Sequence, residues 1–312
     1  MELKIESILN FLRDENYDFY FDGNKDDTIG GFSTLFNYKV NTMTFVSSLN
    51  KFGDYAQLFR EDKEIALIII DPSEKIHGCF KNVIQLKNPK NVFFKVLDKF
   101  FGESTDDNNI ISSNSDIYKK FSYVSDKATI GENVKIGVGC VIEGDVCIGD
   151  NTVIHHNVVI RNKTRIGNNC TILSGTVIGE SGFNPLKSED GSRMMIKHYG
   201  GVTIEENVHI GDKCSISRGA IDDTIIRSGV KINKNVIIAH NVVIGKNTIF
   251  TAPTFVCGSV KVGEKCHVAA NVIRNQCIVG NGATLGLGSV VVDNVLAGVT
   301  VVGNPAKPII KK

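Results

Sequence analysis

Isoleucine recurs at six-residue steps along the second half of the chain. The repeat is unbroken at Ile130, Ile136, Ile142, Ile148, Ile154, Ile160, Ile166, Ile172 and Ile178. In each six-residue unit, or hexad, an aliphatic residue holds position 1, glycine often follows, and position 5 takes a small or β-branched residue. Three hexads build one triangular coil of short parallel strands with the position-1 side chains stacked inside. The pattern predicts a mainly β fold, a left-handed parallel β-helix over residues 124–303, whose left hand is carried over from the known class of such repeats.

The repeat breaks in three places, and we expect the functional site near them. A loop over residues 179–201 leaves the wall of the helix and returns to it. Residues 222–225 interrupt the hexads, and the step from Val268 to Ile273 is one residue short. Loops as long as the first are more often functional than idle in compact folds.

Residues 1–103 lack the repeat and predict a small α+β domain. The apolar residues near the N-terminus follow the 3.6-residue period of a helix, and an Asn-Pro pair precedes a second amphipathic segment. The expected elements are a helix around 5–12, strands over 42–46, 65–70 and 83–86, and a closing helix over 92–100. Residues 104–123 are rich in Ser, Asp and Asn and predict a linker, and residues 304–312 form a C-terminal tail.

Composition and charge narrow the class of protein. Of the 312 residues, 42% are apolar, which is enough for a large core. A net charge of +1 and a pI near 7.6 give no broad electrostatic reason to expect a nucleic-acid partner. The N-terminus does not resemble a signal peptide, and the longest aliphatic run, Ile65 to Ile70, is too short to cross a bilayer. We therefore expect a cytoplasmic protein without a transmembrane segment.

The eight cysteines do not form a metal or disulfide framework, because no two are spaced as a CxxC pair. Four of them, Cys140, Cys170, Cys214 and Cys266, hold position 5 of their hexads. That position takes a small inward-facing side chain, so we interpret them as reduced core residues and expect no metal site.

Five short motifs carry a more specific signal. They are Ser174-Gly175-Thr176-Val177-Ile178-Gly179, Ser181-Gly182-Phe183, Arg218-Gly219-Ala220, Asp223-Thr224 and Ile238-Ala239-His240-Asn241-Val242-Val243-Ile244-Gly245. With their spacings they resemble the UDP-3-O-acylglucosamine N-acyltransferases of lipid A biosynthesis, and the resemblance extends over nearly the whole chain. It implies a homotrimer, with sites between the prisms, that moves an acyl group from a thioester carrier to the amine of a UDP-linked amino sugar. The carrier is acyl carrier protein or coenzyme A, and no bound cofactor is implied.

An amine that attacks a thioester must lose a proton, and a base that titrates near neutral pH serves best. By resemblance His240 is this general base and Asn241 is a polar contact of the substrate. The alternative for His240 is a solvated corner residue, since position 3 of a hexad usually faces outward. The histidines without such a motif, His155, His156, His209 and His267, are interpreted as surface residues. Backbone N–H groups at the corners are candidates for stabilising an oxyanion.

The resemblance also implies substrate-binding residues elsewhere. In the N-terminal domain, Phe45 and Phe52 are candidates for stacking uracil, with Asn50 as a polar contact; the alternative that both Phe residues are core stays open. Gln276 stands where the family carries a second histidine, two coils beyond His240. Phe183, in the loop, is a candidate for lining the acyl chain, and a role of this loop in trimer contacts is equally open.

Two other functions stay open from the sequence. One is an acyl-CoA-dependent N-acyltransferase that acts on another nucleotide-linked amino sugar for a surface polysaccharide. It is suggested by family positions that differ here, such as Ser217 and Ile237, and by a tail shorter than the helical one with which the family recognises acyl carrier protein. The other is a non-catalytic sugar-binding scaffold, against which the intact Ile238-Ala239-His240-Asn241 motif argues.

Overall fold

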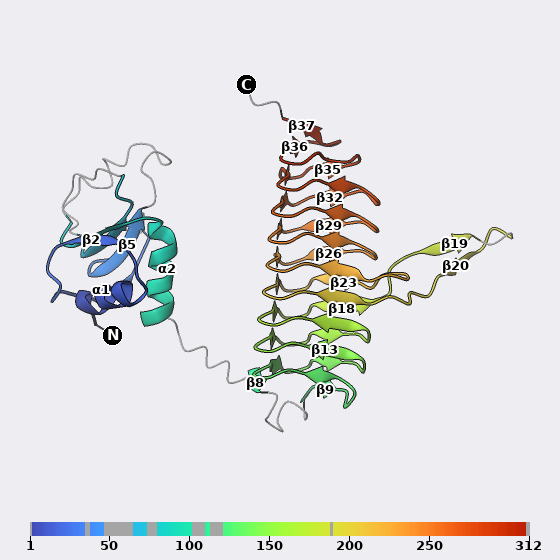
Figure 1. Ribbon diagram of the computed structural model, residues 1–312, viewed down its shortest axis with the longest axis horizontal. Helices are drawn as coiled ribbons and strands as arrows, with labels where there is room; N and C mark the ends of the chain where they lie inside the picture. The colour runs from blue at the N-terminus through green and yellow to red at the C-terminus, as the bar shows by residue number, and fades with distance from the viewer. Residues whose placement is uncertain are drawn as a thin grey trace. The chain divides into compact units, whose positions relative to one another are not determined.

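The computed structural model describes residues 2–34, 38–46, 65–73, 80–101, 110–112, 121–187 and 190–309. The chain divides into two compact units, residues 1–106 and 107–312, and this division falls inside the segment expected to be a linker (Figure 1). Within the described ranges, no helix combines the length and apolar character that a bilayer span requires.

The first unit is an α+β domain, as the sequence predicts, with two helices and a five-stranded sheet in the described residues; strands β2 and β4 of this sheet were not predicted. Strands β4, β5, β6 and β7 are parallel and β2 joins the edge of β7 antiparallel, in the order β2-β7-β6-β5-β4. The elements are β1 (Leu3–Lys4), α1 (Ile5–Asp14), β2 (Phe19–Asp22), β3 (Thr28–Ile29), β4 (Gly31–Phe32), β5 (Thr42–Val46), β6 (Leu67–Ile70), β7 (Val83–Leu86) and α2 (Pro89–Phe100). Helix α1 buries the apolar face that its 3.6-residue period marks, and α2 begins with Pro89, whose fixed φ suits a first helical turn.

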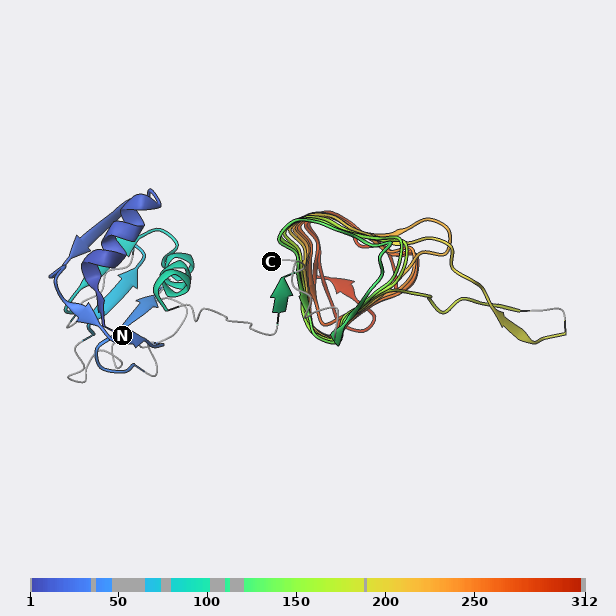
Figure 2. The same cartoon turned by 90° about the horizontal axis from the view of Figure 1, so that it is seen from below.

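The second unit is the expected left-handed parallel β-helix, with a triangular cross-section (Figure 2). Its three walls are sheets of eight, eleven and nine described strands.

The eight-stranded wall consists of β10 (Thr129–Ile130), β13 (Val146–Ile148), β16 (Thr164–Ile166), β21 (Val202–Ile204), β24 (Thr224–Ile226), β27 (Val243–Ile244), β30 (Lys261–Val262) and β33 (Ile278–Val279). The eleven-stranded wall consists of β8 (Ile110–Ser112), β11 (Lys135–Gly137), β14 (Val153–Ile154), β17 (Thr171–Ile172), β22 (His209–Ile210), β25 (Lys231–Ile232), β28 (Ile249–Thr251), β31 (His267–Ala269), β34 (Thr284–Leu285), β36 (Thr300–Val302) and β37 (Lys307–Pro308). The nine-stranded wall consists of β9 (Tyr123–Val124), β12 (Val141–Ile142), β15 (Val159–Ile160), β18 (Val177–Glu180), β23 (Ser215–Ser217), β26 (Val236–Ile238), β29 (Thr254–Val256), β32 (Val272–Ile273) and β35 (Val290–Val291).

The interior of the β-helix confirms the hexad pattern. From Ile136 onward the position-1 isoleucines are buried in a single continuous core, together with Cys140, Cys170, Cys214 and Cys266, and Ile130 is partly buried against it. Position 5 also buries threonines, whose hydroxyl groups donate to backbone carbonyls: Thr152 to Gly167 O at 2.9 Å and Thr176 to Gly211 O at 2.8 Å. These bonds remove the cost of burying a polar group, so the repeat accepts threonine there.

Two short strands extend the walls beyond the predicted repeat. Strand β8 lies in the segment expected to be a linker and pairs antiparallel with β11, and β37 lies in the expected tail and pairs antiparallel with β36. Both cover an end of the β-helix, where an open sheet edge otherwise exposes unpaired N–H and C=O groups.

The loop over residues 179–201 is a β-hairpin that extends from one corner of the prism (Figures 1 and 2). Its strands β19 (Pro185–Lys187) and β20 (Arg193–Met195) pair antiparallel with each other, and the sequence analysis did not predict them. Their side chains have no buried face, since Leu186, Met194 and Met195 are all more than half exposed.

Candidate functional site

A groove of about 800 Å³ lies at the corner of the β-helix where the hairpin begins. It is lined by Ser181, Gly182, Phe183, Asn184, Ser217, Ala220, Ile237, Ala239, His240, Asn241, Phe255, Cys257, Gly258, Ser259, Asn275 and Gln276. The groove thus brings together four residues that the sequence singles out, namely His240, Asn241, Gln276 and Phe183. His240 and Asn241 come from one coil, Gln276 from a second coil, and Phe183 from the loop.

The residues expected to bind uridine belong to the first unit. Phe45 is partly buried in β5, with its ring centroid 4.8 Å from that of Phe93 and 6.1 Å from that of Phe94, both in α2. Asn50 and Phe52 lie outside the described residues.

His240 stands at the corner that follows β26. Ile238 is buried inside the prism, and Asn241 at position 4 has a left-handed backbone with φ of 60°, a conformation that asparagine tolerates well. This geometry turns the chain by one corner and leaves the imidazole half-buried in the groove.

The Asn241 side chain fixes which nitrogen of His240 carries the proton. Its Oδ1 accepts the Ala220 N–H at 3.0 Å, and its Nδ2 donates to Asp222 O at 2.9 Å, so the amide has one orientation. The same Oδ1 lies 3.1 Å from His240 Nδ1. Because a carbonyl oxygen only accepts, Nδ1 of the neutral ring donates the proton and Nε2 keeps its lone pair. The amide oxygen and nitrogen of Asn241 thus both have partners within this chain. A contact between Asn241 and the substrate stays a prediction.

Two glycines lie against the His240 ring. A Cβ atom added to Gly258 would lie 2.7 Å from His240 Nε2, and one added to Gly182 would lie 2.9 Å from Cδ2. Neither distance is compatible with a side chain, so glycine at both positions leaves space for the imidazole. Nε2 therefore lies next to the Gly258 backbone, one coil further along the prism.

A second histidine near this ring was missed by the sequence analysis. His198 is only 2% exposed, and its ring centroid lies 5.3 Å from that of His240 with an interplanar angle of 61°. Burial, and then the proximity of His240, lowers the pKa of His198. His198 lies in the loop outside the hexads, so no periodic signal marks it.

The remaining predicted residues line the open side of the groove. The Gln276 N–H donates to Gly258 O at 3.0 Å, and the Gln276 side chain is exposed. Phe183 is 81% exposed, which is unusual for a phenylalanine. Among the residues that the structure describes, no three His, Cys, Asp or Glu side chains are placed to share a metal ion.

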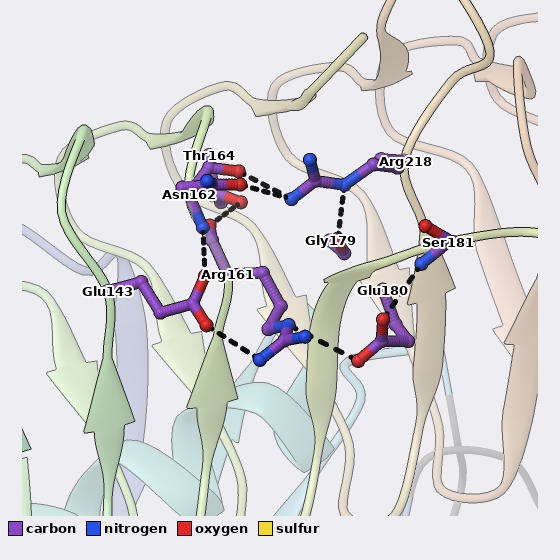
Figure 3. A network of polar contacts seen from close by, with 8 residues as sticks. All are labelled: Glu143, Arg161, Asn162, Thr164, Gly179, Glu180, Ser181 and Arg218. Carbon is purple, nitrogen blue, oxygen red and sulfur yellow. Dashed lines mark hydrogen bonds and ion pairs between the residues drawn. The ribbon is translucent and has the colours of Figure 1, made fainter. Parts of the chain in front are cut away.

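A polar network holds the root of the loop in place (Figure 3). The Arg218 guanidinium donates to Gly179 O and, at 2.7 Å each, to the backbone and side-chain oxygens of Asn162. Arg161 bridges Glu143 at 2.6 Å and Glu180 at 3.2 Å. These contacts tie three coils to the point where the loop leaves the wall, and so they position Ser181 and Gly182 beside His240. One role of the Arg218-Gly219-Ala220 motif is therefore to hold the root of the loop through the hydrogen bonds of Arg218.

Two models of known protein families match the hexapeptide repeat of this chain. Residues 127–162 and 148–180 match the family model described as bacterial transferase hexapeptide (six repeats). Residues 235–273 match the model described as hexapeptide repeat of succinyl-transferase. Both matches fall on the β-helix and confirm its hexapeptide character.

Individual proteins similar to this chain identify the family more closely than the repeat models do. The chain is 38% identical over 244 residues to a UDP-3-O-acylglucosamine N-acyltransferase of Francisella tularensis, covering 72% of this chain and 68% of that protein. It is 40% identical over 99 residues to a protein of the same name from Delftia acidovorans, covering 32% of this chain and 29% of that protein. Its fold is similar to the UDP-N-acetylglucosamine acyltransferase of Bacteroides fragilis, with a TM-score of 0.55 and 25% identity over 61% of this chain and 72% of that one. These likenesses confirm the resemblance found in the motifs.

Proposed function

The chain belongs to the UDP-3-O-acylglucosamine N-acyltransferase family, and on this premise we propose that it transfers an acyl group from a thioester carrier to the amine of a UDP-linked amino sugar. The acceptor we propose is UDP-3-O-acylglucosamine, as in lipid A biosynthesis, and the donor is an acyl carrier protein thioester. The observation that carries the proposal is the pairing of His240 Nδ1 with Asn241 Oδ1 at 3.1 Å in the wall of an open groove.

His240 is the general base in this proposal. The amine nitrogen attacks the thioester carbonyl, an N–C bond forms, and His240 Nε2 removes a proton from the nitrogen. The tetrahedral intermediate then collapses, the C–S bond breaks, and the departing thiolate takes the proton from His240. General-base catalysis contributes about 10² to 10⁴ in rate, which suits a substrate that is already activated as a thioester.

The oxyanion of the intermediate needs a donor close to the base. The Gly258 N–H makes no hydrogen bond within the described part of the chain, and its residue borders His240 Nε2. A backbone N–H of this kind stabilises a developing negative charge without reorganisation. We assign it the role of oxyanion donor.

The apolar part of the groove suits the acyl group. Phe183, Ile237 and Phe255 line the groove and are all at least 40% exposed. An acyl chain laid against them removes their apolar surface and its own from water, which is favourable in proportion to the area buried. Gln276, on the same side, is a polar contact for the sugar or the carrier arm.

We propose a homotrimer, and the outward face of the nine-stranded wall supports an interface between subunits. Position-6 residues stack in register along it: Tyr123, Val141, Val159, Val177, Ser215, Ile237, Phe255, Val272 and Val290. All but Ser215 are apolar or aromatic, and a face this continuous usually meets another protein surface. Because Ile237 and Phe255 also line the groove, a neighbouring prism on this wall completes the site.

An acyl-transfer assay with purified protein tests the proposal. UDP-3-O-acylglucosamine with a hydroxyacyl carrier protein is compared with acyl-CoA and simpler UDP-linked amino sugars. We expect product from the first pair. Product only from acyl-CoA and another amino sugar points to the surface-polysaccharide alternative, and no product from any pair supports a sugar-binding scaffold.

A further inference from the structure

His198 carries a buried polar atom that has no partner. Its Nε2 is inaccessible and makes no hydrogen bond within the described part of the chain. A buried acceptor left without a partner costs free energy, and such atoms in folded proteins call for a reason. The proposed general base is the ring beside it.

The state of the His198 ring follows from its other nitrogen. Nδ1 lies 3.2 Å from Ile196 O, and because a carbonyl only accepts, Nδ1 carries the proton. Nε2 therefore holds a lone pair. Burial, and then the proximity of His240, lowers the pKa of His198; the hydrogen bond to Ile196 O opposes this shift, and Arg218 adds a smaller lowering.

Gly182 lets the two histidines approach each other. A Cβ atom at Gly182 would lie 3.2 Å from His198 Nε2 and 2.9 Å from His240 Cδ2. Both ring atoms therefore border the same small space, which stays free only because residue 182 has no side chain. The two ring centroids are 5.3 Å apart with an interplanar angle of 61°, so the rings meet edge to face.

We propose that His198 is a positioning residue for His240, and that its Nε2 lone pair stabilises the positive charge on His240 after the proton leaves the amine. The inference rests on the proposed function. The contact gains strength only when His240 becomes charged, so it favours the transition state over the bound substrates. Losing it lowers kcat and leaves KM unchanged.

Two amide substitutions at residue 198 distinguish the electrostatic role of His198 Nε2 from a role in packing alone. The amide of glutamine reaches the place of Nε2, whereas that of asparagine reaches only the place of Nδ1. We expect His198→Gln to keep turnover of the UDP-3-O-acylglucosamine probe within about twofold, and His198→Asn to lower kcat roughly tenfold, with KM and Tm near the wild-type values. Unchanged kcat in His198→Asn, or an equal loss in both variants, overturns the inference.

A double-mutant cycle separates the inference from the proposed function. If His198 acts through His240, His198→Asn has no further effect in a His240→Ala background. An equal loss in both backgrounds overturns the role of His198 and leaves His240 as the base. Full activity of His240→Ala alone rejects the base assignment instead.

A spectroscopic measurement is independent of activity. In protein labelled with ¹⁵N-histidine, NMR distinguishes protonated from unprotonated ring nitrogens. We expect His198 to show a protonated Nδ1 and an unprotonated Nε2 at neutral pH. A proton on Nε2 overturns the inference whatever the substrate.

Discussion

Asn241 Oδ1 accepts the Ala220 N–H at 3.0 Å and lies 3.1 Å from Nδ1 of His240, so a single amide oxygen joins the backbone of one coil to the imidazole of the next. The Nδ2 of the same amide donates to Asp222 O, which prevents the amide from turning over. Residues 222–225 are one of the three breaks in the hexad repeat, and this contact explains why the break lies beside the site.

The orientation of His240 therefore depends on Asn241. We expect Asn241→Ala to lower kcat about a hundredfold, because a ring free to turn no longer keeps Nε2 toward the groove. Asn235→Ala is the matched control, since Asn235 has a similar left-handed φ of 54° away from the groove. Steady-state kinetics and thermal melting of both variants check this, and equal turnover in the two contradicts the orienting role.

The space beside His240 Nε2 depends on Gly258. We expect Gly258→Ala to lower turnover at least tenfold, because its Cβ would lie 2.7 Å from the reacting nitrogen and must displace the ring. The backbone of Gly258 is not left-handed, so alanine itself fits there. In a His240→Ala background the same substitution leaves Tm unchanged. A Gly258→Ala enzyme with wild-type kcat rules out this placement of the base.

His198 makes stability depend on pH. Its pKa is lowered in the folded protein by burial and by His240, so below the ordinary histidine value of about 6.5 the unfolded chain takes up the proton first. The contribution of His198 to the free energy of unfolding is fully present above that pH. It decreases as pH falls, by up to about 1.4 kcal/mol per pH unit. Thermal melting from pH 7.5 to 5 should show a shallower loss in His198→Gln than in the wild type or in His267→Gln. Parallel curves for all three proteins refute this.

The proposed trimer depends on the apolar face of the nine-stranded wall. Val272 is 42% exposed there and lies outside the groove. We expect Val272→Asp to yield monomers, because a buried charge without a partner is costly at an interface. Ile278→Asp is the matched control, since Ile278 is 50% exposed on the eight-stranded wall. Light scattering after size exclusion measures both masses, and a trimeric Val272→Asp protein contradicts this interface.

The β-helix could be predicted from the hexads because an aliphatic residue at every sixth position fits one arrangement, in which these side chains stack inside the coils. Ile238 and Ile244 fix the register on both sides of His240, so its corner position followed from counting alone. The strands of the first unit followed from apolar runs such as Val83–Leu86. The hairpin β19–β20 did not, because its exposed residues show no alternation between a buried and a solvated face.

The site was predictable only where it lies in the repeat or in a motif. His240 and Gln276 became candidates in this way, whereas His198 lies in the loop and approaches His240 only through the fold. The role of Asn241 as an orienting group was also hidden, because its bonds to Ala220 and Asp222 join residues about twenty positions apart. The spacing of residues within one coil does not reveal which backbone groups of the neighbouring coil a corner side chain will contact.

The most direct test of the account is the rate of N-acyl transfer by His240→Ala, with His267→Ala as a control from the eleven-stranded wall. If His240 is the general base, the first variant loses about 10² to 10⁴ in kcat with an unchanged Tm, and the control retains wild-type turnover. A His240→Ala protein that transfers the acyl group as fast as the wild type contradicts the central claim.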